Sequence, residues 1–130
     1  RYEKDAEMEK LSYKKIPSIF SDFTDKVTPK IFHKENIFND FNREPLMPYM
    51  LSKEGPAVAV ADINSDGYND FYMGSSSFNK SRIFMGGKDE NYHLANHPEI
   101  YNDSISEDID AVFFDADNDK DLDLYVESAP

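Results

Sequence analysis

The sequence predicts an all-β fold, and three observations support this prediction. Apolar residues gather in short runs bounded by glycine, proline, serine, asparagine and aspartate, which is typical of strands joined by turns. A unit made of an apolar run, an acidic loop and a second apolar run occurs twice, and its loops begin 53 residues apart, at Asp62 and Asp115. Four short strands in about 50 residues is the spacing of one β-propeller blade.

The predicted strands follow one another at this spacing. The first unit consists of an apolar run, its acidic loop and a short return strand, after which two further strands are separated by serine-rich and glycine-rich turns. The second unit repeats the strand, loop and strand. The expected strands are 57–61, 71–73, 81–85, 92–94, 109–114 and 124–126, with a polar connection at 96–107.

The length of 130 residues limits how many such units are present. Two 53-residue units fit after a non-repeating segment, whereas repeat architectures need about three units for stability. The chain also begins with Arg1. We therefore expect a partial β-propeller, a fragment of a larger one. Its parts are a charged tail or short helix at 1–18, an extended lead-in segment packing on the sheet at 19–56, a first blade at 57–108 and the start of a second at 109–130.

The lead-in segment carries apolar clusters that look buried. Residues 19–24 are expected to form a short strand or a docking segment, and residues 31–33 and 37–38 are expected to be buried in the same way. Three prolines in the stretch from Asn39 to Pro56 inclusive exclude a continuous helix or a central strand there. We expect an extended, ordered loop.

Composition excludes several classes of function. With 14 basic and 26 acidic residues, the net charge of −12 argues against nucleic acid as a partner. No cysteine is present, so disulfides and thiolate metal sites are excluded within the chain. No apolar run is long enough for a transmembrane segment. No nucleophile motif, phosphate-binding glycine loop or isolated acid pair indicates a catalytic centre, and we expect no enzymatic activity.

The two acidic loops have the ligand spacing of a calcium site. Side chains at positions 1, 3 and 5 of a tightly turned loop converge, the backbone carbonyl at position 7 adds an oxygen, and position 9 completes the shell. Oxygen-only ligands at this density suit Ca²⁺, whereas Mg²⁺ keeps more of its waters. The predicted ligands are Asp62, Asn64, Asp66, the carbonyl of Tyr68 and Asp70 in the first loop, and Asp115, Asp117, Asp119, the carbonyl of Asp121 and Asp123 in the second.

The first loop is the better formed of the two on this evidence. Gly67 follows its third ligand, where the turn favours a positive φ. Lys120 holds the same place in the second loop, and a residue other than glycine there costs about 1–2 kcal/mol if φ is positive.

Two other interpretations of the loops fit the sequence less well. An EF-hand loop needs a bidentate glutamate at position 12, where this sequence has Met73 and Val126, and the flanking segments are strand-like. A solvated acidic turn without metal is the second alternative. It does not explain why the same spacing recurs between apolar runs.

These residues resemble a known family. Residues 57–74 and 111–126 are similar to the FG-GAP or VCBS repeats of integrin-type β-propellers, in which such loops hold Ca²⁺. Blocks upstream, at 23–25, 33–36, 40–46 and 51–56, resemble those before the first repeat in secreted bacterial VCBS-repeat proteins that also carry ASPIC/UnbV domains. Lys120 and Ser75-Ser76 depart from the family pattern.

The resemblance implies a function in binding. We expect an extracellular or bacterial cell-surface module with two Ca²⁺ ions, which takes part in adhesion or binds a protein or glycan partner. The alternatives are an accessory propeller of a secreted carbohydrate-active enzyme, a lyase or esterase, and a subunit of an outer-membrane complex.

Overall fold

The computed structural model describes residues 18–37, 39–53, 55–102 and 104–129, so nearly all of the predicted charged tail lies outside the described residues. Within them the fold is all-β, as predicted. Strands predominate, accompanied by short 3-10 turns (η) and one helix of 5 residues. In chain order the elements are η1 (Thr24–Lys26), β1 (Val27–Thr28), η2 (Asp40–Asn42), η3 (Leu51–Lys53), β2 (Val58–Ala61), β3 (Asp70–Met73), β4 (Arg82–Gly86), β5 (Tyr92–Leu94), α1 (Pro98–Asn102), β6 (Glu107–Phe114) and β7 (Asp123–Ala129).

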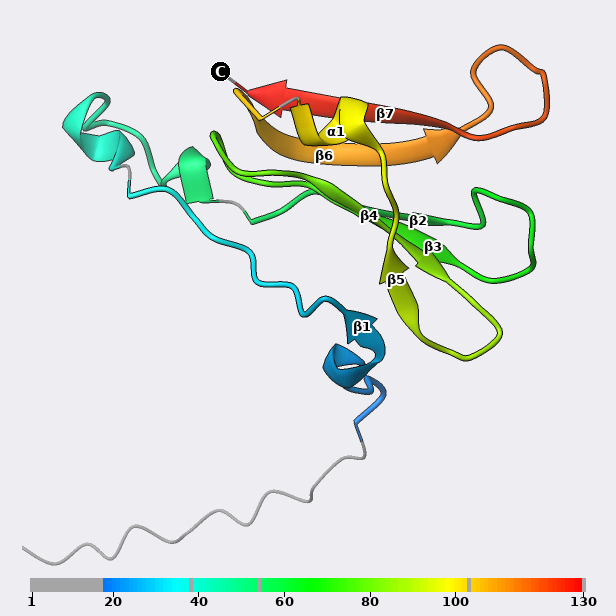
Figure 1. Ribbon diagram of the computed structural model, residues 1–130. Coiled ribbons are helices and arrows are strands. Elements are labelled where there is room, and N and C mark those ends of the chain that lie inside the picture. The colour runs from blue at the N-terminus through cyan, green and yellow to red at the C-terminus, as the bar shows by residue number, and fades with distance from the viewer. Residues whose placement is uncertain (1–17, 38, 54, 103, 130) are drawn as a thin grey trace, which may run out of the picture.

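The strands form two layers. A five-stranded sheet has the order β1-β5-β4-β3-β2, in which β2 to β5 are antiparallel neighbours and β1 pairs in parallel with β5. Strands β6 and β7 form a separate antiparallel hairpin that lies over the first sheet (Figure 1). Four successive antiparallel strands followed by a new hairpin agree with a partial propeller, one blade and the start of the next.

The 53-residue repeat is visible in the strand register. In the first hairpin, β2 pairs with β3, and in the second, β6 pairs with β7, at positions that correspond one for one. The pairs are Val58↔Met73, Ala59↔Tyr72, Val60↔Phe71 and Ala61↔Asp70, and then Ala111↔Val126, Val112↔Tyr125, Phe113↔Leu124 and Phe114↔Asp123. Both units therefore place equivalent residues on equivalent faces.

The core lies between the two layers. Buried Ala59, Tyr72 and Ile83 of the first sheet form a cluster with Ala57, and partly buried side chains of the second hairpin pack against it. These side chains are Ala111, Phe113, Leu124 and Val126. Small alanines on β2 allow the second hairpin to approach closely. Gly74 serves the same purpose, since a Cβ there would lie 2.7 Å from the Cβ of Asp108.

A buried carboxylate also joins the two layers. Asp108, at the start of β6, is 8% exposed and accepts hydrogen bonds from the Tyr72 hydroxyl at 2.8 Å and the Ser75 amide at 3.2 Å. The Ser81 hydroxyl donates to the same carboxylate oxygen, and Ser128 from β7 donates to the other at 3.3 Å. These donors satisfy the buried charge, and they fix β6 against the end of β3.

Parts of the lead-in segment differ from the prediction. Ile19, Phe20, Phe32 and Ile37 are exposed, so their expected burial is wrong, and residues 19–24 form no strand. Phe38 lies outside the described residues. Of the residues expected to dock, Phe23 and Ile31 do face the sheet, together with Val27, which was not singled out. The strand in this segment is β1, at the edge of the sheet.

Two connections contain more regular structure than predicted. The loop at 39–56 holds the turns η2 and η3, stabilised where the Asn39 side chain accepts from the Phe41 amide at 3.1 Å and the Asp40 carboxylate accepts from the Ser52 amide at 2.9 Å. The polar connection at 96–107 contains α1, which begins at Pro98, since proline is well tolerated at the first helical position.

Candidate metal centre

The first acidic loop joins β2 to β3, and its own amides hold its side chains in place. The Asp62 carboxylate accepts hydrogen bonds from the amides of Asp66 at 3.0 Å and Gly67 at 2.8 Å. The Asp66 amide also donates to Asn64 Oδ1 at 3.0 Å, and the Tyr68 amide donates to Asp66 Oδ1 at 2.9 Å. The side chains at positions 1, 3 and 5 are therefore turned toward the inside of the loop.

The second acidic loop joins β6 to β7 and repeats these hydrogen bonds. The Asp119 amide donates to Asp115 Oδ1 at 3.1 Å and to Asp117 Oδ1 at 3.2 Å. The amides of Lys120 and Asp121 donate to Asp115 Oδ2 at 3.1 Å and to Asp119 Oδ1 at 3.0 Å. Each bond corresponds to one in the first loop, 53 residues earlier. Both loops project at the same end of the molecule (Figure 1).

The backbone conformation repeats as well. Ser65 and Asn118, at position 4, have φ of 58° and 67°. Gly67 and Lys120, at position 6, have φ of 88° and 81°. The expected positive φ at position 6 is confirmed in both loops, so Lys120 adopts a left-handed conformation that costs a side-chain residue about 1–2 kcal/mol.

The residues at position 9 close both loops but differ in their surroundings. The Asp70 carboxylate accepts from the Ile63 amide at 3.0 Å and from the Gly86 amide of β4 at 2.8 Å, and Asp70 is fully buried. The Asp123 carboxylate accepts from the Ala116 amide at 2.9 Å and is exposed. Within the described residues, only the first loop is therefore tied by its closing carboxylate to a neighbouring strand.

The second loop brings three carboxylates close together. One oxygen from each of Asp115, Asp117 and Asp123 lies within 4.8 Å of the others. Oxygens that share a Ca²⁺ ion at about 2.3–2.6 Å lie within about 5 Å of one another, so these three fit one coordination shell. Among the described residues no lysine, arginine or histidine forms an ion pair with either loop. Backbone amides, together with the Asn64 side-chain amide in the first loop, donate the hydrogen bonds that offset the repulsion between these acids.

Two neighbouring carboxylates of the second loop influence each other's protonation. A hydrogen bond with the Asp119 side chain, followed by the charge of Asp119, raises the pKa of Asp121. The Asp121 amide is the main cause that lowers the pKa of Asp119. Asp119 therefore stays ionised to a lower pH than Asp121.

The predicted ligands occupy comparable places in both loops. The Asp66 amide donates to the side chains of both Asp62 and Asn64, and the Asn64 side-chain amide donates to the Asp66 carboxylate at 2.9 Å. Asp70 closes the loop through the Ile63 amide. In the second loop, Asp115, Asp117 and Asp123 converge. The metal-binding roles of these side chains, and of the carbonyls of Tyr68 and Asp121, stay predictions.

The Gly86 amide is a contributor that the sequence reasoning missed. It donates to Asp70 from 16 residues away, and no local pattern reports a bond between a loop and the end of a later strand. The Gly86-Gly87 pair is the available signal. A side chain at position 86 would place its Cβ 2.3 Å from the carbonyl oxygen of Asn69, so this close approach requires glycine.

One comparison with known proteins gives a match, and it covers the first unit. No curated protein and no solved structure matches the chain significantly. No helix among the described residues has the length and apolar character needed to cross a membrane. Residues 55–91, which carry β2, the first acidic loop, β3 and β4, match the family model of the FG-GAP repeat.

Proposed function

We propose that this chain is a non-enzymatic calcium-binding module of β-propeller type, which binds a protein or glycan partner outside the cell. The observation that carries the proposal is the repetition of one hydrogen-bonded loop in two places. Five amide-to-side-chain bonds and two positive φ values recur 53 residues apart, in loops whose side chains offer oxygen ligands. A solvated acidic turn without metal would not explain why this arrangement is repeated.

The residues present fit a calcium ion in each loop. The side chains of Asp62, Asn64, Asp66 and Asp70 would hold one ion together with the Tyr68 carbonyl, and their equivalents would hold the second. Bound Ca²⁺ would supply the positive charge that the acidic loops lack. It would stiffen the two hairpins at the end where both loops project (Figure 1).

Extracellular calcium levels support the location that we propose. Extracellular calcium modules bind with dissociation constants of about 10⁻⁴–10⁻³ M, and calcium outside cells is abundant enough to fill such sites. A location outside the cell also suits the FG-GAP repeat at 55–91.

Thermal unfolding with and without calcium tests the metal-binding part. A site filled at 100 times its dissociation constant adds about 2.7 kcal/mol to the free energy of unfolding. We expect the melting temperature to rise by several degrees in Ca²⁺ relative to chelator, and by less in equimolar Mg²⁺. A variant with Asp66→Ala and Asp119→Ala should lose this difference. An unchanged melting temperature of the wild-type chain would overturn the metal assignment.

A second candidate function is that of an accessory module in a secreted carbohydrate-active enzyme, a lyase or esterase. The exposed ring of Tyr68, within the first acidic loop, favours this function because aromatic rings stack on sugars. Retardation of the chain in gels containing acidic polysaccharide, in Ca²⁺ but not in chelator, would support it. Equal migration of the wild-type chain and Tyr68→Ala would contradict a stacking role.

The third candidate, a subunit of an outer-membrane complex, is favoured by the unpaired edge of the two-stranded sheet. Among the described residues β7 pairs only with β6. Such edges invite pairing with a neighbour. Recovery of the chain alone after gentle cross-linking on cells would count against this candidate.

A further inference from the structure

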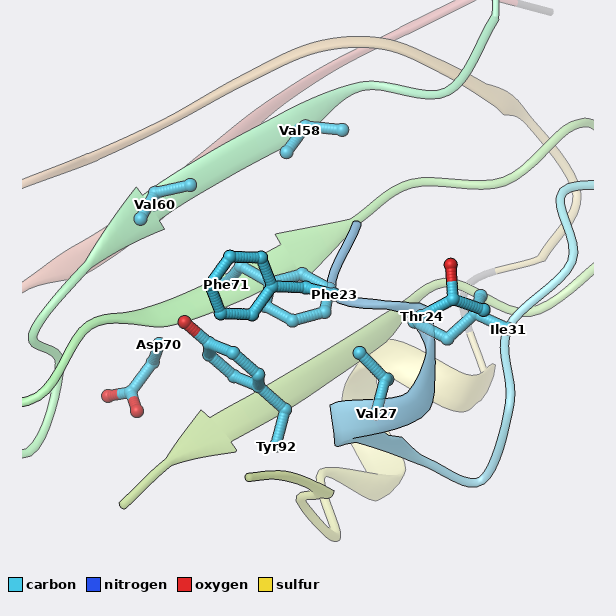
Figure 2. A pocket seen from close by; sticks show the side chains of 9 residues that line it. All are labelled: Phe23, Thr24, Val27, Ile31, Val58, Val60, Asp70, Phe71 and Tyr92. Atoms are coloured by element: carbon cyan, nitrogen blue, oxygen red, sulfur yellow. The ribbon is translucent and has the colours of Figure 1, made fainter. Parts of the chain in front are cut away.

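Two cavities beside the lead-in segment differ in chemical character. The larger, of about 480 Å³, is lined mainly by apolar side chains such as Phe71 (Figure 2). The smaller, of about 70 Å³, is here called the basic pocket. No aspartate or glutamate is among the described residues that line it, whereas four basic residues do so: His33, Lys34, Lys80 and Arg82.

The positive charges of the basic pocket lack acidic partners. The chain has 26 acidic residues against 14 lysines and arginines, so partners are abundant. Among the described residues, however, Lys34, Lys80 and Arg82 take part in no salt bridge. His33 differs, because its Nε2 lies 2.5 Å from Glu35 Oε1. The pocket therefore gathers three charges that no described side chain neutralises.

Two acids contact residues that line the basic pocket, and both already have partners. Glu35 is paired with His33. Asp108 accepts from the Ser75 amide at 3.2 Å and also from the Tyr72 hydroxyl at 2.8 Å. Neither acid forms a salt bridge with the two lysines or the arginine of the pocket. Their charges are held by other groups.

Hydrogen bonds fix the two walls of the basic pocket against each other. One wall belongs to the lead-in segment, and the other to the turn before β4. The hydroxyl of the fully buried Ser76 donates to the Lys34 carbonyl at 2.6 Å, and the Asn36 side chain donates to the Ser77 carbonyl at 3.1 Å. The Asn79 side chain donates to the Ser76 hydroxyl at 2.9 Å. The pocket is therefore formed before any ligand enters, which lowers the cost of binding.

The size of the basic pocket and its lining indicate the kind of ligand. A water molecule takes up about 30 Å³ in the liquid, so the pocket has room for about two waters or one carboxylate group. Lysine and arginine bind carboxylates through charged hydrogen bonds, and the planar group of Arg82 can donate two of them. Phe32 also lines the pocket and is 80% exposed, so its ring is open to packing against a sugar.

We infer that the basic pocket binds the carboxylate group of an acidic sugar, whose ring packs on Phe32. This inference rests on the glycan-binding part of the proposed function and names the class of glycan. The pocket lies at the opposite end of β3 from the first acidic loop, because β3 begins at Asp70 and ends at Met73, which lines the pocket. The sugar is therefore held by side chains and not by the proposed calcium ions.

Titrations followed by nuclear magnetic resonance test this assignment, in chelator and at low ionic strength. The probes are glucuronate, glucose, which lacks the carboxylate, and acetate, which lacks the ring. Glucuronate should shift the amide signals of Lys34, Lys80 and Arg82 and saturate with a dissociation constant of about 1 mM, as expected for a ligand of this size. Glucose should bind at least about tenfold more weakly. Acetate should bind at least about threefold more weakly.

Variants of the pocket separate the roles of charge and ring. Lys80→Gln and Arg82→Gln should each weaken glucuronate binding about tenfold. Phe32→Ala should weaken glucuronate binding about threefold and leave acetate binding unchanged. Lys88→Gln removes the same charge at an exposed position in the turn between β4 and β5, and should bind like the wild-type chain. Lys80 is also exposed, so its variant should keep the fold, and the dispersion of the amide signals reports this.

Glucuronate that shifts none of the three pocket amides would overturn the inference. So would equal binding by the wild-type chain and a folded Lys80→Gln chain, or acetate that binds as tightly as glucuronate. These results do not depend on calcium, because chelator is present throughout. The calcium assignment fails on a different result, a melting temperature that does not respond to Ca²⁺, so the two failures are distinguishable.

Discussion

The two acidic loops share one internal arrangement but differ in what surrounds them. In both, amides at positions 5, 6 and 7 donate to side chains at positions 1, 3 and 5. The first loop has glycine at the left-handed position 6 and a buried closing carboxylate bound to β4. The second has Lys120 and the exposed Asp123. The spacing of the ligands therefore determines the conformation of each loop, whereas contacts with neighbouring strands determine how stable that conformation is.

The largest expected difference concerns the closing carboxylates. Asp70→Ala removes the acceptor of the Ile63 and Gly86 amides at a fully buried position, and we expect a loss of about 2–4 kcal/mol in the free energy of unfolding. Asp123→Ala removes one bond at an exposed position and should cost about 1 kcal/mol. Urea unfolding in chelator measures both costs without bound metal. Equal losses would show that the link to β4 contributes nothing.

The next comparison separates side-chain ligands from carbonyl ligands. Asp119→Ala removes a proposed ligand, whereas Asp121→Ala and Tyr68→Ala leave the proposed carbonyl ligands in place. We expect Asp119→Ala to weaken calcium binding at the second loop by about tenfold or more, equivalent to at least about 1.4 kcal/mol. The other two should each change the affinity by less than about threefold. Calorimetric titration measures these affinities, and a larger loss in Asp121→Ala would reverse the assignment of roles.

Substitutions at position 6 should reduce the difference in backbone strain between the two loops. Lys120→Gly relieves the left-handed strain, partly offset by the greater entropy of glycine in the unfolded chain, and should add about 0.5–1 kcal/mol. Gly67→Lys should cost about the same. Lys120→Asn is the control for charge, because asparagine tolerates this conformation. Melting temperatures measured in chelator rank these variants by stability. A Lys120→Gly chain that is less stable than the wild-type chain would contradict the strain at this position.

The smallest expected effect is a pH dependence of stability due to Glu107, where the second unit meets the lead-in segment. Burial, then repulsion from Glu35, raises the pKa of Glu107 above its ordinary value of 4.5. The protonated form is therefore favoured in the folded state, and its contribution to stability is present at low pH and is lost as pH rises through the raised pKa. Glu107→Gln should stabilise the chain at pH 7 but not below about pH 4.

The control for this pH dependence is Glu127→Gln, at an exposed position on the same hairpin. Its melting temperature should follow the wild-type value across the pH range. A Glu107→Gln chain that shows no gain at neutral pH would contradict the buried position of this carboxyl group.

Much of the fold follows from local patterns in the sequence. Alternating small and branched residues before the first acidic loop predict β2, and the repeat predicts that β6 and β7 copy β2 and β3. The positive φ at Lys120 follows from its equivalence to Gly67. These features depend on nearby residues and on comparison of the chain with itself, so sequence reasoning reaches them.

Other features depend on residues far apart in the chain. Ile19 and Phe20 look like a buried strand, yet Phe23 and Val27 contact the sheet, because pairing of β1 with β5 determines where the segment docks. The Gly86 amide on Asp70 and the donors around Asp108 likewise join distant elements. No local pattern encodes these contacts, so they emerge only when the layers are assembled.

Calcium titration followed by nuclear magnetic resonance tests the central claim most directly. The Gly67 and Lys120 amides report on the two loops, because each donates to the first proposed ligand of its own loop. Both signals should shift and saturate as calcium is added, and Gly67 should reach its midpoint at the lower concentration. Signals that do not shift, or that drift without saturation up to tens of millimolar calcium, would contradict the assignment of these loops as calcium sites.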